Sequence, residues 1–343
     1  MKNIAMMPAG TFMKWLRRAG YGIAGLVVVL LISTLIALVA YRDIPADVLE
    51  AKYANEESRF MHVDGVRIHF RDVGTGPPVV LIHAHFANLI GWDPWVDALK
   101  QDYRVIRFDM TSHGLTGPDP SGDYTLERTI ELTERFVDAL DLDEFAIAGT
   151  SMGGTVAMHY TARHPERISK LILLSPGALE GRAMTEENKG RMGTPLDIVT
   201  YITPRALPKF MLKGGFGDPD KVTDELVDRW YEMWMREGQR EAEVARMRQY
   251  EPGDLEGVVA SITRPVLLMW GEANTRASIE QAPVFVDMLS SAESVQLITY
   301  PGVGHMAVQE AGDLTAVDAV AFLNGTLEIE ADEVIEEEPA TEG

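Results

Sequence analysis

The stretch "AIAGTSMGGTVAM", residues 146–158, decides how the rest of the chain is interpreted. An apolar run typical of a buried strand leads into Gly-Thr-Ser-Met-Gly, and a helix-like pattern follows at once. A Gly-x-Ser-x-Gly pattern between a strand and a helix is typical of a sharp turn that exposes its serine. The flanking glycines relieve crowding, so we expect the Ser151 hydroxyl to project at the edge of a sheet. Met152 then offers its backbone N–H at a helix N-terminus, which suits a developing oxyanion.

Similar apolar runs recur along the chain and alternate with helix-like stretches. "RFMHVDG" and "VRIHFRDVG" read as two strands joined at Asp64-Gly65, a hairpin signal. Six further runs indicate buried strands: "PPVVLIHAH", "YRVIRFDM", "EFAIAGTS", "ISKLILLSP", "PVLLMWGE" and "SVQLITYPG". Helices are expected around 92–100, 125–140, 152–164, 278–290 and 306–324. The pattern predicts an α/β fold with a mostly parallel eight-stranded sheet, helices on both faces, and sites at the C-terminal strand ends.

Residues 180–252 interrupt this alternation and show helical periodicity instead. We therefore expect a helical cap over the strand ends, inserted into a core formed by 60–179 and 253–325. The aromatic stripe of Trp230, Tyr231 and Trp234 either packs against the core or lines a substrate pocket. Two segments flank the core: a linker over 42–59, and a tail over 326–343 with eight acidic residues and no basic one. That composition predicts disorder.

The N-terminal region predicts a membrane anchor. Between Arg18 and Arg42 lie 23 uncharged residues, which as a helix would extend roughly 34 Å. A secretory signal peptide has a shorter apolar region, so a retained span over 19–41 is favoured over cleavage. The basic residues of segment 1–18 place that segment in the cytoplasm by the positive-inside rule. The expected protein is single-pass, bound to the lipid bilayer, with its catalytic domain outside the cytoplasm.

Composition restricts the partners. The formal net charge is −21 and the chain has no cysteine. Nucleic-acid binding requires clustered Lys and Arg, so this balance argues against such a partner. The missing cysteines exclude disulfides and thiol chemistry but leave the compartment open.

The order of the elements, "GTSMGG", the cap and "YPGVGHM" resemble the α/β-hydrolase superfamily over residues 60–324. The resemblance is closest to the capped serine hydrolases that include esterases, lipases and meta-cleavage-product C–C hydrolases. It implies that Ser151 is the nucleophile and that His305, in the loop after the last strand, is its base. It also implies an oxyanion hole formed by the N–H groups of His85 and Met152, and no cofactor.

Three polar residues near the strand ends are expected to be structural. His83 and His113 would hydrogen-bond within their loops, and Asp109 would accept from nearby backbone donors. The ligand spacings typical of zinc are missing, so no metal site is predicted.

The triad acid is absent from both of its usual positions. In relatives "W-G-E-x-D" follows the penultimate strand, whereas this chain has Asn274 in "WGEAN". The other usual position, after the sixth strand, holds Ser175. Either Asn274 orients His305 through its amide oxygen, or Glu272 or Glu180 substitutes for the acid, or catalysis is lost.

The favoured function is hydrolysis of a small apolar, lipid-like or aromatic carboxylic ester through an acyl-enzyme on Ser151. Two alternatives remain open: C–C bond hydrolysis of ring-cleavage products, and non-catalytic binding by a membrane-anchored protein.

Overall fold

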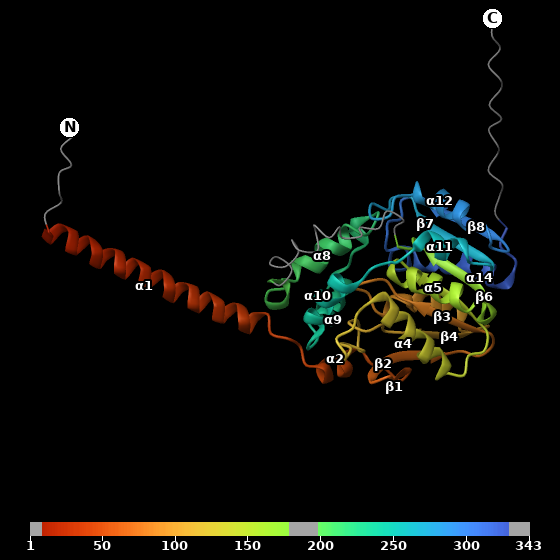
Figure 1. Cartoon of the computed structure of the whole chain (residues 1–343), viewed down its shortest axis with the longest axis horizontal. Coiled ribbons are helices and arrows are strands. Elements are labelled where there is room, and N and C mark those ends of the chain that lie inside the picture. Colours follow the sequence, from red (N-terminus) through yellow and green to blue (C-terminus); the bar gives the residue numbers. More distant parts are fainter. Residues whose placement is uncertain (1–8, 178–197, 329–343) are drawn as a thin grey trace, which may run out of the picture.

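The computed structural model describes residues 9–177 and 198–328, and within them a single sheet of eight strands. Strand β2 pairs antiparallel with β1 and with β4, and all other neighbouring strands run parallel. The predicted mostly parallel eight-stranded sheet is confirmed (Figure 1). Its order is β1-β2-β4-β3-β5-β6-β7-β8, with β1 Ser58–Val63, β2 Val66–Val73, β3 Pro78–Ile82, β4 Arg104–Phe108, β5 Phe145–Thr150, β6 Ile168–Leu174, β7 Val266–Gly271 and β8 Val295–Tyr300.

The hairpin between β1 and β2 turns at the predicted dipeptide. Asp64 has φ 49° and Gly65 has φ 83°. Two consecutive residues with positive φ fit the two-residue turn that matches strand twist, and Asp-Gly is a preferred sequence for it. The hairpin prediction is confirmed.

Helices cover both faces because apolar side chains alternate along the central strands. In β3, Val80 and Ile82 join one core with helices α4 Leu126–Asp138, α5 Met152–Arg163, α11 Leu255–Ala260 and α12 Gln281–Met288. Val79 and Leu81 join a second core on the opposite face, with α3 Asp93–Leu99, α13 Ala307–Glu310 and α14 Gly312–Asn324. The central strands are therefore buried on both faces, as their continuous apolar runs predict.

Between β6 and α11, the described part of the chain contains helices α8 Ala206–Lys213, α9 Asp224–Trp234 and α10 Gln239–Gln249. Leu212 and Trp230 from this insertion form a third apolar cluster with Ala84, Ala87 and Met306 of the loops that follow β3 and β8. The insertion thus packs on the C-terminal ends of the strands. The first part of the predicted cap, 180–197, lies outside the described residues.

The segment predicted as a linker is more ordered than expected. It contains α2, Ala46–Tyr53, whose Leu49 is buried against Leu115 and Met233. The Ile44 N–H donates to the Met235 carbonyl at 2.7 Å, and the segment is thereby fastened to the cap. The sequence did not reveal this because two helical turns with one buried leucine carry almost no periodic signal.

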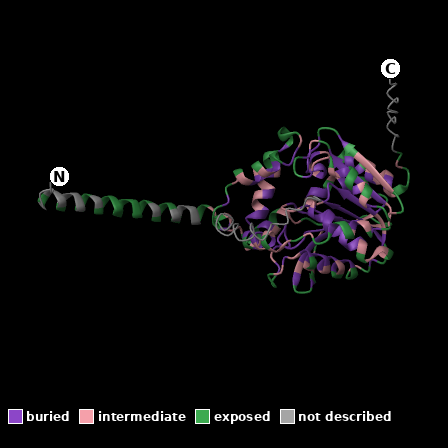
Figure 2. Cartoon of the chain, turned by 45° about the horizontal axis from the view of Figure 1, so that its top comes forward, coloured by how far each residue is buried: buried purple, intermediate pink, exposed green. Residues whose placement is uncertain are grey.

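The N-terminal residues form helix α1, Ala9–Ala40, which projects away from the domain (Figure 1). Where its side chains are described they are mostly exposed (Figure 2). Across the described residues, no helix has both the length and the apolarity that crossing a membrane requires. The structure therefore does not support the predicted span over 19–41. The acidic tail from residue 329 onward lies outside the described residues.

Asp109, directly after β4, accepts from backbone donors of the loops after β3 and β4, as predicted, and also contacts strand β2. Its carboxylate accepts from the Leu89 N–H at 2.8 Å, the Leu115 N–H at 2.9 Å and His69 Nδ1 at 2.7 Å. Burial alone would raise the pKa of Asp109, but the hydrogen bond and charge of His69, with the other donors, lower it to about 2.

Because the folded pKa is below the unfolded value, ionised Asp109 stabilises the fold above pH 4, and this contribution is lost as the pH falls from 4 to 2. The shift from 3.8 corresponds to about 2 kcal/mol. We expect Asp109→Asn to have a lower free energy of unfolding than wild type at pH 6. The difference between the two proteins should become smaller toward pH 2. Urea unfolding at several pH values measures it, with the exposed Asp143→Asn as control. A gap that does not change with pH would contradict the assignment.

Candidate active site

Ser151 occupies a strained turn between β5 and α5, with φ 51° and ψ −119°. A side chain at Gly149 would collide with the Gly153 backbone, and one at Gly153 would collide with the carbonyl of Ile82. The strand and the helix approach each other this closely only because both positions are glycine. Non-glycine residues in such backbone conformations cluster at functional sites. The geometry matches the sharp serine turn expected from the sequence.

His305 lies beside this serine, in the loop after β8. Its Nε2 is 2.9 Å from Ser151 Oγ. The loop is held by the buried Glu310, whose Oε2 accepts from the N–H groups of Gly304 at 2.7 Å and Gly217 at 2.9 Å. Glu310 thus fastens the histidine loop to the cap. The sequence did not single out this residue, since nothing in its pattern distinguishes it from a surface glutamate.

Asn274 contacts His305, but through its nitrogen. Asn274 Nδ2 lies 3.2 Å from His305 Nδ1, while Oδ1 accepts from the N–H groups of Arg276 at 2.9 Å and Ala277 at 3.0 Å. Flipping the amide would place its NH₂ group against two backbone donors, so the network fixes the orientation. The prediction that Asn274 orients His305 through its amide oxygen is therefore wrong: the loop backbone already uses that oxygen.

This orientation fixes the tautomer of His305. An amide NH₂ is only a donor, so Nδ1 must accept, and the neutral ring carries its proton on Nε2. Burial, followed by the charge of Arg276, lowers the pKa of His305 to about 4, so the ring is neutral at pH 7. His305 therefore donates a hydrogen bond to Ser151 Oγ. It has no lone pair at Nε2 with which to take the serine proton.

Of the other candidate acids, Glu272 does not replace Asn274. Glu272 is exposed, and its Oε1 accepts from Thr299 Oγ1 at 2.8 Å. The structure thus places it away from His305. Ser175 is buried, and its hydroxyl has no hydrogen-bond partner among the described residues. Glu180 lies outside the described residues.

A cavity of about 240 Å³ opens at Ser151 and His305. Arg276 lines it, as do Phe86, Trp230 and, from the loop after β8, Met306. Its wall is therefore largely apolar, with a cation nearby. Of the predicted aromatic stripe, Trp230 lines the cavity. Trp234 packs on Phe86 with ring centroids 4.9 Å apart.

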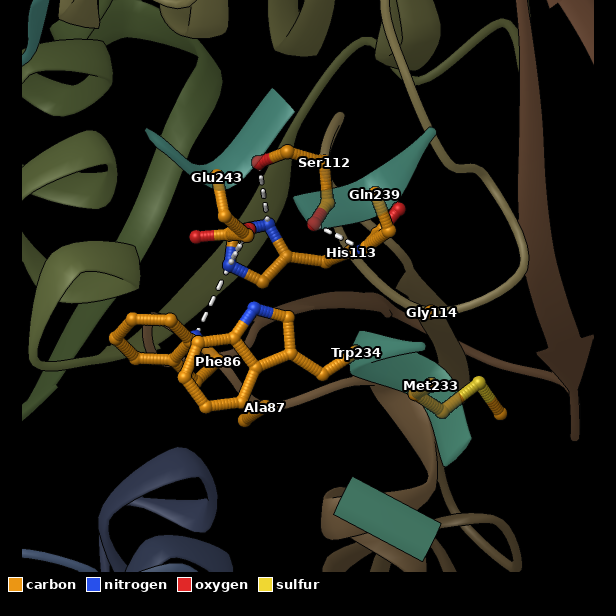
Figure 3. A pocket seen from close by; sticks show the side chains of 9 residues that line it. All are labelled: Phe86, Ala87, Ser112, His113, Gly114, Met233, Trp234, Gln239 and Glu243. Carbon is orange, nitrogen blue, oxygen red and sulfur yellow. Dashed lines mark hydrogen bonds and ion pairs between the residues drawn. The ribbon is translucent and has the colours of Figure 1, made fainter. Parts of the chain in front are cut away.

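His85, predicted through its backbone, also lines this cavity with its side chain. Its Nε2 is 2.6 Å from Glu243 Oε2 on cap helix α10. Figure 3 shows Glu243 beside His113 in an adjoining small pocket. Glu243 is a second site residue that the sequence did not reveal, because it is 158 positions from His85 and lies within a helix rich in charged residues.

His85, His113 and Glu243 offer ligand atoms within 4.8 Å of one another, which is close enough for a metal ion. However, His113 Nε2 accepts from the Phe86 N–H at 3.0 Å, and Nδ1 faces the Thr111 carbonyl at 2.9 Å. Both ring nitrogens of His113 are therefore used. Burial lowers its pKa well below the ordinary value, which keeps it neutral. We therefore assign the cluster as a hydrogen-bonded pair of His85 and Glu243 beside a neutral His113 whose nitrogens are used within its own loops.

His83 has the predicted structural role. Its Nδ1 donates to the Ala84 carbonyl at 2.7 Å, and its Nε2 accepts from the Met110 N–H at 3.0 Å. With both nitrogens engaged and the side chain buried, His83 joins the loops after β3 and β4. It has no free lone pair for catalysis.

Comparison with known proteins agrees with this geometry. The family described as alpha/beta hydrolase fold matches residues 77–198. A 2-hydroxy-6-oxo-6-(2'-aminophenyl)hexa-2,4-dienoic acid hydrolase from Metapseudomonas resinovorans is 26% identical over 279 residues, covering 79% of this chain and 92% of the relative. With the fold and the serine turn, these matches show an α/β-hydrolase fold whose relatives are hydrolases.

Two solved structures illustrate the likeness. A serine hydrolase involved in carbazole degradation has a TM-score of 0.66 at 26% identity, covering 78% of this chain and 98% of that one. A bacterial membrane phospholipase A has a TM-score of 0.68 at 22% identity, and the match covers 90% of this chain and 100% of that one. The second likeness is one of fold alone.

We expect Asn274→Asp to increase activity. A carboxylate facing Nδ1 would accept a proton from it, leave Nε2 as the acceptor for the serine proton, and raise the pKa of His305. The reverse change in a serine protease costs about 10⁴-fold in kcat, which sets the upper limit of the gain. The rate of Ser151 labelling by a fluorophosphonate measures the effect.

Asn55→Asp, on an exposed loop, controls for the added charge. An unchanged labelling rate in Asn274→Asp would show that the tautomer of His305 does not limit the reaction.

Proposed function

We propose that the chain hydrolyses apolar carboxylic esters through an acyl-enzyme on Ser151. The observation that carries the proposal is the strained serine turn: its Oγ is within hydrogen-bond distance of His305 and opens into a cavity. In this mechanism Ser151 attacks the ester carbonyl, and the N–H groups of Met152 and His85 stabilise the oxyanion. His305 donates a hydrogen bond from its Nε2–H toward the serine oxygen and keeps that proton.

The cavity supports an apolar acyl group. Phe86, Trp230 and Met306 present two aromatic rings and a flexible thioether beside Ser151. These surfaces favour a lipid-like or aromatic acyl chain by burial of apolar area. Arg276 at the same cavity adds tolerance for a negative charge on the substrate.

C–C bond hydrolysis of ring-cleavage products is a second candidate. The full-length relative from Metapseudomonas resinovorans supports it, since that protein is a hydrolase of a hexadienoic acid. The serine turn and the cap suit this reaction as well. Comparing turnover of aryl and alkyl esters with that of 2-hydroxy-6-oxo-dienoates distinguishes the two.

The first test is the intact mass of the purified chain after treatment with a fluorophosphonate. We expect one adduct in wild type and none in Ser151→Ala, together with ester turnover that Ser151→Ala abolishes. A folded chain with no adduct and no turnover would contradict the proposal and favour a binding protein built on a hydrolase fold.

We also propose, from the sequence alone, that the domain lies outside the cytoplasm. The uncharged stretch between Arg18 and Arg42 and the basic residues before it support this position. Protease added to spheroplasts should digest the full chain. A chain that lacks residues 1–41 should stay inside the cell and be protected from the protease. Protection of the full chain would place the domain in the cytoplasm instead.

A further inference from the structure

The reaction proposed above requires a proton acceptor, and His305 does not supply one. Asn274 Nδ2 donates a hydrogen bond to His305 Nδ1, so the ring carries its proton on Nε2, which faces Ser151 Oγ. We propose that His85, oriented by Glu243, is the catalytic base of this pocket. The inference rests on the proposed serine hydrolysis and identifies the second imidazole of the same cavity as the group that takes the serine proton.

The contact between His85 and Glu243 is a close pair with a buried acid. His85 Nε2 and Glu243 Oε2 are 2.6 Å apart, and the two side chains are 26% and 2% exposed. The histidine therefore opens onto the cavity while its acid is enclosed in the cap. Phe86 stacks on the imidazole with ring centroids 3.9 Å apart, which restrains its orientation.

Glu243 has the surroundings of a charged carboxylate. Arg246, three residues further along α10, is fully buried, and its own contacts are to neutral groups, including Ser112 Oγ and the Thr111 carbonyl, both at 2.7 Å. Burial lowers the pKa of Arg246, and the charge of Glu243 counteracts that effect. The guanidinium of Arg246 therefore lies one turn from the carboxyl group of Glu243, whose Oε2 faces His85 Nε2 as a hydrogen-bond acceptor.

The contact with Glu243 Oε2 fixes the tautomer of His85. Nε2 must donate to the carboxylate, so the neutral ring keeps its lone pair on Nδ1. Among the described residues, none forms a hydrogen bond to that nitrogen. The cavity thus contains two imidazoles in opposite tautomers: His305 presents a proton, and His85 keeps an acceptor.

Glu243 also carries an unsatisfied oxygen. Its Oε1 has no hydrogen-bond partner among the described residues and lies 3.4 Å from His113 Nε2. That nitrogen already accepts from the Phe86 N–H, so it offers no proton. A buried carboxylate oxygen without a donor is costly. Packing alone does not account for a carboxylate at this position, whereas orientation of His85 does.

The proton and electron balance is complete. The proton of Ser151 Oγ passes to His85 Nδ1, directly or through one water in the cavity, as Oγ bonds to the carbonyl carbon. The carbonyl π electrons move to the oxygen. When the intermediate collapses, the C–O bond breaks and the leaving alkoxide takes the proton from Nδ1. In the second half, water attacks the acyl carbon and gives a proton to His85 Nδ1, the bond from carbon to Ser151 Oγ breaks, and Oγ takes that proton as the acid is released.

The test is a double-mutant comparison of Glu243→Gln in two backgrounds, wild type and Asn274→Asp. Glutamine keeps the shape of the side chain but removes the charge that fixes His85. In wild type we expect a loss of about 10²-fold or more in kcat and in the rate of fluorophosphonate labelling. In Asn274→Asp we expect little further loss, because His305 then accepts the proton. Glu241→Gln, exposed on the same helix, is the matched control.

The outcomes separate the possible causes. An equal loss in both backgrounds would assign Glu243 a purely structural role and overturn the proposal, and thermal melting checks that each variant folds. His85→Ala should reproduce the background dependence, and its failure to do so would also overturn the proposal. A wild type that reacts but is unaffected by Glu243→Gln refutes only this inference. A chain that labels in neither background refutes the proposed function itself.

Discussion

The turn at Ser151 is the constraint on which the rest of the site depends. A serine at φ 51° is unfavourable by itself and persists only because its surroundings enforce it. Strand β5 lies between β3 and β6, and α5 packs closely enough on β3 that Gly153 meets the carbonyl of Ile82. The backbone is thus held from both sides. The other residues of the site, including His305 and His85, surround the hydroxyl that this turn presents.

The parallel sheet brings the other residues to the same edge. His85, Asn274 and His305 follow β3, β7 and β8, and the carboxyl ends of parallel strands share one side of the sheet. Sequence patterns are sufficient for this level of description, because long apolar runs and the serine turn specify the strands and their direction. The positions of Ser151 and of the neighbouring His305 were predictable for that reason.

The features that the sequence did not reveal depend on the orientation of single atoms or on contacts between residues far apart in the chain. Whether Asn274 presents oxygen or nitrogen to His305 depends on two backbone N–H groups in its own loop. Glu243 becomes a site residue only when α10 folds back over the loop after β3. Neither fact leaves a periodic or compositional signal. The short helix α2 was missed for a related reason, since its order derives from contacts with the cap.

The electrostatics of His305 show why a second base is needed. Its pKa falls from 6.5 to about 4, so placing a proton on this ring costs about 3 kcal/mol more than in water. A carboxylate at Nδ1 would offset that cost, and a neutral amide does not. His85 has the opposite arrangement, since its Nε2 lies 2.6 Å from a carboxyl oxygen of the buried Glu243. In this cavity the imidazole that is paired with a carboxyl group accepts the serine proton and returns it to the leaving group, whereas the imidazole that carries its proton on Nε2 only donates a hydrogen bond.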